Sequence, residues 1–271
     1  MICFTRTIGE RVIKIFIDTL LYNHNKKILN KIFQSYIVCD GSETKTITAN
    51  DKSIYITERY IDSLNCYVCN TLKKDWIQDL INTIEEWQAD ILNCTVLHGS
   101  ALSIKGKGVL VLGNRKKGKT TLTGYLSLIE GHPYLDDDCI YCYNNKYIGF
   151  NMPISIRKNV DNLPSDCLIG TTTDIDNMER DLFISPYIEE IDKIDLIIFP
   201  NYNETSIDEM KLISDRKILT NLLIKNTRHH NNLRNMCIDI SNLSRFTTAF
   251  ELYYSNSKTA CEMIYAVLDS M

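Results

Sequence analysis

The sequence has no hydrophobic run that approaches the roughly 18 to 20 consecutive apolar residues of a membrane-spanning helix. Its N-terminus also lacks the charged start, long apolar run and small-residue cleavage site of a secretory leader. The ten cysteines are spread over 271 residues, which is too dilute for a small disulfide scaffold. We therefore expect a cytoplasmic protein that keeps its N-terminus and has no membrane partner.

Repeats, low-complexity tracts and linkers rich in proline and glycine are also absent. Charge of neither sign dominates, because 30 Lys and Arg stand against 34 Asp and Glu, for a net charge of −4. This balance argues against a protein that coats nucleic acid or an anionic membrane. With 44% hydrophobic and 24% charged residues, the composition is that of an ordinary globular protein. Any anion-binding site must therefore be local.

The pattern along the chain indicates two modules. Residues 1–94 read as a β-rich module, with a hairpin whose arms at 47–48 and 54–56 flank a polar turn. Apolar residues then recur with a helical period over 75–91, which predicts a long amphipathic helix. Residues 95–271 alternate strands with helices, which predicts an α/β domain.

Within the second module, residues 109–112 form an apolar run without alternation, which is typical of a strand buried on both faces. A helix follows over 122–129, and Gly131 stands where a left-handed C-cap is expected. The remaining predictions are strands over 95–104, 139–143, 194–199 (ended by Pro200) and 250–254, helices over 207–223 and 260–267, and a polar loop over 226–232.

A phosphate-binding motif lies between the buried strand and its helix. Its residues are Gly113, Asn114, Arg115, Lys116, Lys117, Gly118, Lys119 and Thr120, a full match to G-x-x-x-x-G-K-[ST], and Thr121 follows. Glycines let backbone amides turn toward phosphate oxygens, the lysine reaches the β- and γ-phosphates, and the threonine hydroxyl can bind Mg²⁺. We expect these nine residues to bind ATP.

The variable positions of this loop are unusual because they hold Arg115, Lys116 and Lys117. If the position of Lys116 requires a positive φ, a lysine there costs about 1 kcal/mol relative to glycine. The positive charges between Arg115 and Lys119 would repel one another without an anion. Both features favour a polyphosphate as the ligand.

Acidic residues do not appear where many phosphate-loop proteins have their second metal ligand. The apolar run 194–199 leads into Pro200 and Asn201 without a carboxylate, whereas Asp136, Asp137 and Asp138 follow the helix of the loop. Adjacent carboxylates are costly unless a cation or a proton relieves them, and Mg²⁺ would do so. An exposed acidic turn is the alternative.

Two further residues have open interpretations. His98 on a strand is by itself most often a hydrogen-bonded core residue. Arg157 follows the acidic segment and could bind a substrate phosphate or carboxylate, but a surface ion pair is equally compatible with its position.

Taken together, His98-Gly99, the strand at Val109, the phosphate loop, Gly131-His132 and Asp137-Asp138 resemble the catalytic domain of HPr kinase/phosphorylase and its relatives. The resemblance is best over about residues 95–150 and weaker over 194–199 and 249–268. It implies a P-loop domain of the HPr kinase and phosphoenolpyruvate carboxykinase type in residues 95–271.

Carried over by position, the resemblance implies roles for the acids and the histidine. Asp137 and Asp138 would be the acid pair, one of which helps to bind Mg²⁺ while the other accepts the proton of the attacking hydroxyl. Thr120 and Asp137 are the expected metal ligands, Lys119 holds phosphates, and His98 would lie beside the transferred phosphate.

The resemblance also has gaps. Asp136 replaces a small residue, and the late glycine-rich signature that supports phosphorolysis is not visible. We expect an ATP- and Mg²⁺-dependent kinase that transfers the γ-phosphoryl group to a hydroxyl, of a serine in a peptide or carrier protein or of free serine. Residues 1–94 would recognise the acceptor, and a homo-oligomer is compatible with the resemblance. A regulatory nucleotide-binding module and an ATP hydrolase are the alternatives.

Overall fold

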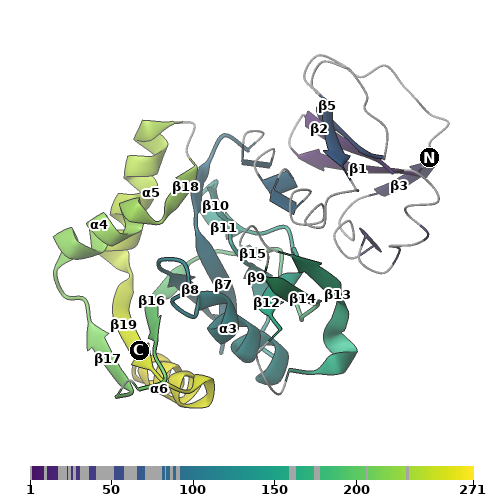
Figure 1. Cartoon of the computed structure of the whole chain (residues 1–271). Helices are drawn as coiled ribbons and strands as arrows, with labels where there is room; N and C mark the ends of the chain where they lie inside the picture. The colour runs from purple at the N-terminus through teal and green to yellow at the C-terminus, as the bar shows by residue number, and fades with distance from the viewer. Residues whose placement is uncertain are drawn as a thin grey trace. The chain divides into compact units, whose positions relative to one another are not determined.

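The structure is a computed structural model of the chain (Figure 1). The residues that it describes are 2–8, 11–17, 23, 26, 29–30, 37–40, 52–57, 66–70, 81–82, 84–85, 88–89, 92–158, 163–173, 178–205, 207–229 and 232–271. The chain divides into two compact units, residues 1–92 with 169–182 and residues 93–168 with 183–271. Helices and several β-sheets together agree with an α/β protein.

The first unit contains a five-stranded sheet with the order β3-β1-β2-β4-β5. Its strands are β1 (Ile2–Ile8), β2 (Arg11–Ile17), β3 (Ile37–Asp40), β4 (Lys52–Thr57) and β5 (Cys66–Asn70). The first arm and most of the turn of the hairpin expected around residues 49–52 lie outside the described residues, and β4, which contains the second arm, runs parallel to both of its neighbours. Antiparallel pairs join β1 to β2 and β1 to β3.

Most of the expected helix over 75–91 lies outside the described residues. Those that the structure describes between 81 and 92 are helical, and Ile81, Ile84 and Ala89 are buried. Two further strands, β13 (Leu168–Thr173) and β14 (Glu179–Phe183), include the later segment of this unit.

The second unit is built around a six-stranded sheet with the order β17-β19-β16-β8-β7-β9. Strands β8, β16 and β19 are parallel, while β7, β9 and β17 pair antiparallel with their neighbours. The bounds are β7 (Gly99–Ile104), β8 (Lys107–Leu112), β9 (Tyr134–Asp136), β16 (Ile194–Tyr202), β17 (Glu209–Leu212) and β19 (Thr248–Tyr254).

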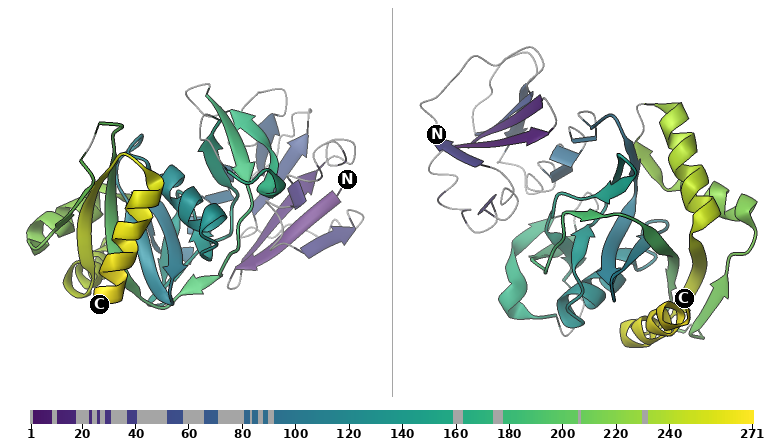
Figure 2. Two further views of the ribbon diagram at one scale, coloured as in Figure 1. Left: turned by 90° about the horizontal axis from the view of Figure 1, so that it is seen from below. Right: turned by 180° about the vertical axis from the view of Figure 1, so that it is seen from behind.

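Helices cover both faces of this sheet (Figure 2). Leu110 and Leu112 pack in one cluster with residues of α4 (Arg216–Lys225) and α5 (Leu233–Phe246). Val109 and Val111 pack in the other cluster with residues of α3 (Lys119–Gly124) and α6 (Ser257–Ser270). This two-sided burial explains the unbroken apolar run 109–112, as the sequence predicts.

A second sheet of this unit has the order β15-β11-β10-β6-β18. Its strands are β6 (Thr95–Leu97), β10 (Ile140–Tyr143), β11 (Lys146–Ile148), β15 (Glu190–Ile191) and β18 (Thr227–His229). The strand β12 (Ile154–Arg157) contributes Ile154 and Ile156 to a small cluster with Tyr134 and Phe183. Within the described residues, no helix combines the length and hydrophobicity needed to cross a lipid bilayer.

Three sequence expectations for this unit need correction. The helix expected over 207–223 is a strand, β17, followed by α4, which begins after Asp215 because that carboxylate caps the amides of Lys217 and Ile218. Strand β16 continues past Pro200 to Tyr202. Its pairing with β8 ends at Ile198, so no N–H is needed at Pro200 on the side that faces β8. The polar stretch after residue 225 contains β18, and α5 was not expected.

Candidate functional site

The register of the central sheet brings three segments to one edge. Gly99 at the start of β7 pairs with Leu112 at the end of β8, and Ala101 pairs with Asp136 at the end of β9. The residues before β7, after β8 and after β9 therefore meet, which places His98, the phosphate loop and the three aspartates side by side. A side chain at Gly99 would lie 2.3 Å from the carbonyl oxygen of Val111, so this close approach requires glycine.

The loop leaves β8 and enters α3 through left-handed backbone positions. The φ angles are 142° at Gly113, 64° at Lys116 and 90° at Gly118. A lysine with positive φ bears the strain expected from the sequence, about 1 kcal/mol. The side chains from Asn114 to Lys117 are exposed, so the loop presents its positive charges to solvent.

Two tyrosines from distant strands fix the end of the loop. The Tyr254 hydroxyl donates a hydrogen bond to the Gly118 carbonyl at 3.1 Å, and the Tyr202 amide donates to the Lys117 carbonyl at 3.2 Å. The two rings meet edge to face, with centroids 5.5 Å apart. A Cβ at Gly118 would lie 2.3 Å from the Tyr254 hydroxyl oxygen, so no side chain fits there.

Asn226, the residue that ends α4, holds the start of the loop. Its side-chain oxygen accepts a hydrogen bond from the Gly113 amide at 2.9 Å, and its backbone carbonyl accepts one from the His98 amide at 2.7 Å. Its side-chain amide donates to the Leu222 carbonyl at 2.8 Å. Only 5% of Asn226 is exposed, so the expectation of a solvated polar loop from residue 226 is wrong at this position. No local pattern marks Asn226, since Gly113 and His98, which it holds, are more than a hundred residues away.

Lys119 is 6% exposed and lies over the loop. Its ammonium group donates to the carbonyl oxygens of Gly113 at 2.7 Å and Asn114 at 3.2 Å, and lies 3.5 Å from Nε2 of His98. Burial lowers the pKa of Lys119, and the charge of Arg115 acts in the same direction, while Asp138 and Asp137 oppose both. The lysine is thus a buried cation close to two acids.

Asp136 is fully buried and serves the fold. Its carboxylate accepts hydrogen bonds from the backbone amides of Phe150 at 2.6 Å, Asp137 at 3.0 Å and Met152 at 3.3 Å. Burial raises its pKa to about 8, although these amides favour the charged form. Asp136 therefore anchors the backbone at Phe150 and Met152.

Asp137 is 6% exposed and meets the phosphate loop. The Ser100 hydroxyl donates to its carboxylate at 3.0 Å, and Thr123 donates in turn to Ser100 at 2.8 Å. The Thr120 side chain also contacts Asp137 and favours its charged form. Burial raises the pKa of Asp137 to about 7, and the charge of Asp138 adds to this effect. The two residues expected as metal ligands, Thr120 and Asp137, are therefore in direct contact.

Asp138 is more accessible, with 45% of its side chain exposed, and its backbone has a φ of 69°. Its carboxylate oxygen lies 3.7 Å from Nδ1 of His98. Burial lowers the pKa of His98, Asp138 opposes this, and the charges of Lys119 and Arg228 add to it; the net effect is a lowered pKa, so the ring is neutral at neutral pH. Arg228, which the sequence did not single out, also donates to the Cys139 sulfur at 3.0 Å.

Two other segments are not joined to this cluster. Arg157 ends β12, and within the described residues it makes no hydrogen bond or ion pair with the loop or the acids. The ring of His132, part of the family-like pattern, has Nε2 2.7 Å from the Tyr265 hydroxyl of α6 and so belongs to a helix contact. Thr121 is half-buried in the first turn of α3.

Comparison with known proteins gives distant structural likenesses. No protein-family model matches the chain, and no curated protein is significantly similar to it. Among solved structures, the HPr(Ser) kinase/phosphatase from Coxiella burnetii matches 65% of this chain and 95% of its own, with 16% identity and a TM-score of 0.27.

Proposed function

We propose that the chain is an ATP- and Mg²⁺-dependent kinase that transfers the γ-phosphoryl group to a hydroxyl acceptor. The observation that carries this proposal is the contact between Thr120, the hydroxyl of the phosphate loop, and the buried carboxylate of Asp137. Asp138 and His98 lie directly beside that contact. Phosphoryl transfer requires a phosphate loop, oxygen ligands for Mg²⁺ and an accessible acid.

The loop would hold the nucleotide through its backbone amides and Lys119. The left-handed positions at Gly113, Lys116 and Gly118 turn the loop backbone so that amides can converge on phosphate oxygens. The Lys119 ammonium group, which donates to two loop carbonyls, would exchange them for oxygens of the β- and γ-phosphates. Neutralising the exposed positive charges of the loop would add to the binding energy.

Thr120 and Asp137 fit the requirements of Mg²⁺. Both offer oxygen atoms, which this ion prefers, and it commonly binds one or two carboxylates together with substrate phosphates. The raised pKa of Asp137 means that the protein alone does not offset the cost of burying its charge. A bound cation would offset that cost. When bound, Mg²⁺ would neutralise charge that develops on the phosphate oxygens.

Asp138 is the candidate proton acceptor because it is more exposed than Asp137. Asp137, in contrast, contacts the Thr120 hydroxyl and is the expected metal ligand. The acceptor oxygen would form a bond to the γ-phosphorus, the bond to the β-phosphate oxygen would break, ADP would leave, and the hydroxyl proton would pass to Asp138. The neutral ring of His98 would keep the Asp138 carboxylate in position. A serine hydroxyl, in a peptide, in a carrier protein or free, is the acceptor we favour, with residues 1–94 in its recognition.

The test is transfer from γ-labelled ATP to a panel of seryl peptides, carrier proteins and free serine. We expect label on an acceptor with the wild-type chain, and at least about a hundredfold slower transfer with Lys119→Ala. Asp138→Asn should slow transfer about a hundredfold or more while ATP still binds. Lys105→Ala and Asp269→Asn are matched controls, because this exposed pair joins the turn after β7 to α6.

The same experiment separates the alternatives. A hydrolase would release labelled phosphate at a rate that no acceptor changes. A regulatory binding module would bind ATP equally well in the wild type and in Asp138→Asn, with no turnover in either. Each of these results would overturn the kinase proposal.

A further inference from the structure

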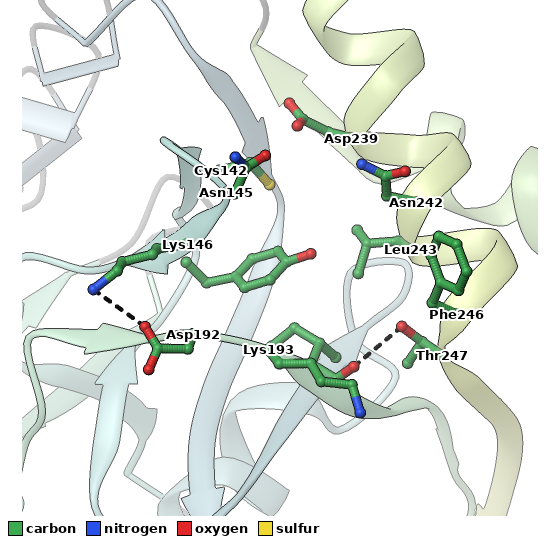
Figure 3. A pocket seen from close by; sticks show the side chains of 12 residues that line it. Cys142, Asn145, Lys146, Asp192, Lys193, Asp239, Asn242, Leu243, Phe246 and Thr247 are labelled. Atoms are coloured by element: carbon green, nitrogen blue, oxygen red, sulfur yellow. Dashed lines mark hydrogen bonds and ion pairs between the residues drawn. The ribbon is translucent and has the colours of Figure 1, made fainter.

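A pocket of about 260 Å³ lies in the second unit, away from the phosphate loop (Figure 3). Ile194 at the start of β16 and Thr247 just before β19 line it. Both strands run parallel to β8, whose opposite end carries the phosphate loop. The pocket therefore lies at the opposite end of these parallel strands from the phosphate loop. Its volume is roughly that of nine water molecules at about 30 Å³ each.

The wall formed by α5 carries a carboxylate without a cationic partner. Asp239 is half-buried, and one of its oxygens accepts a hydrogen bond from the Thr95 hydroxyl at 2.6 Å. Within the described part of the chain it forms no ion pair. Burial raises its pKa, because the charged form loses water that no protein cation replaces.

The other charged residues of the pocket are already neutralised. Lys146 pairs with Glu190 and also with Asp192, the latter at 3.1 Å, as the dashed line in Figure 3 shows. Lys193 pairs with Asp195 at 2.7 Å. The pocket thus combines two compensated lysines with one uncompensated carboxylate, so its unbalanced charge is negative.

The rest of the lining suits the body of an organic ligand. Leu243 is buried, Phe246 is 66% exposed, and Tyr147 also lines the pocket. Aromatic faces attract cations as well as apolar groups. Burial raises the pKa values of the Cys142 thiol and the Tyr147 phenol, and the charge of Asp239 acts in the same direction, so neither group carries a charge at neutral pH.

We propose that this pocket binds a small organic cation: an ammonium group paired with Asp239 and carried on an apolar or aromatic body that contacts Leu243, Phe246 and Tyr147. The site is separate from the phosphate loop and does not depend on the proposed kinase activity. A compact amine fits the volume, balances the half-buried carboxylate of Asp239 and leaves the existing ion pairs intact.

Benzylamine, benzyl alcohol and benzoate form a matched set of probes, because they share the ring and differ in charge. Each is titrated into the full-length ¹⁵N-labelled protein and followed by amide chemical shifts. We expect saturable binding of benzylamine with a Kd of about 1 mM, as small ligands allow, and shifts at Tyr147, Leu243 and Thr247. The amides of residues 113–120 should not move, and the alcohol and the acid should bind at least about tenfold more weakly.

Asp239→Asn keeps an oxygen for the Thr95 hydroxyl and removes the charge, so the variant should fold and bind benzylamine about tenfold more weakly. Asp269→Asn removes the same charge on α6, which does not line the pocket, and should bind as the wild type does. Phe246→Ala, at an exposed position, should also weaken binding. Equal affinity in Asp239→Asn and the wild type, equal binding of benzoate, or no saturation would each overturn the proposal.

Discussion

Replacing Asn226 with alanine tests how the phosphate loop is held in place. The change removes the hydrogen bonds from the Gly113 amide and to the Leu222 carbonyl, but keeps the backbone contact with His98. The Leu222 carbonyl still accepts the Asn226 backbone amide, so its loss is small, whereas the Gly113 amide is left without its partner. At about 1 kcal/mol for the lost bond and about 1 more for the unpaired amide, we expect stability to fall by about 2 kcal/mol.

The same variant should bind ATP more weakly. Without Asn226 the nucleotide itself must order Gly113, the first glycine of the loop. We expect this to cost about 1.4 kcal/mol of binding free energy, which corresponds to a tenfold higher Kd for ATP. Urea unfolding gives the stability, and titration calorimetry with ATP and Mg²⁺ gives the affinity.

Asn232→Ala is the matched control. Asn232 caps α5 by accepting hydrogen bonds from the amides of Arg234 at 2.9 Å and Asn235 at 3.3 Å. Its loss should cost about 1 kcal/mol of stability and leave ATP affinity unchanged. The reasoning is refuted if the two variants weaken ATP binding equally, or if Asn226→Ala binds ATP as tightly as the wild type.

Three further outcomes are expected. Gly118→Ala should lower stability by about 2 to 4 kcal/mol in urea unfolding, because the φ of 90° disfavours a side chain and the new Cβ meets Tyr254; an unchanged midpoint would contradict this. Without nucleotide or metal, stability should fall as pH rises from about 4 to about 8. The folded-state pKa values of Asp136, about 8, and Asp137, about 7, exceed the ordinary 3.8, so the folded protein binds more protons than the unfolded chain in this range. Stability that rises over this range would contradict the prediction. Thr120→Ala should require more Mg²⁺ for ATP binding than Thr120→Ser, which keeps the hydroxyl; equal Mg²⁺ dependence would argue against Thr120 as a ligand.

Features that depend on consecutive residues could be predicted from the sequence. The phosphate loop is a contiguous motif, so its position between a buried strand and a helix followed from local pattern, as did the left-handed φ that was anticipated at Lys116. The apolar run 109–112 indicated burial on both faces, which the two helix-covered clusters explain.

Features that depend on pairing between distant segments could not. Residues 207–223 have apolar positions that suit a helix, yet the pairing of β17 with β19 decides the first part as a strand. Among three adjacent aspartates, the sequence did not distinguish Asp136, which binds backbone amides inside the fold, from Asp137, which contacts Thr120.

The sequence by itself determined that this protein has a phosphate-type loop with excess positive charge, followed closely by a cluster of acids. The tertiary structure alone decided that Asn226 and Tyr254 hold the two ends of that loop, and that Asp239, bonded to the Thr95 hydroxyl, lines a separate pocket. The physical reason is that a local motif encodes backbone conformation, whereas burial and the pairing of polar groups depend on sheet register and helix packing across more than a hundred residues.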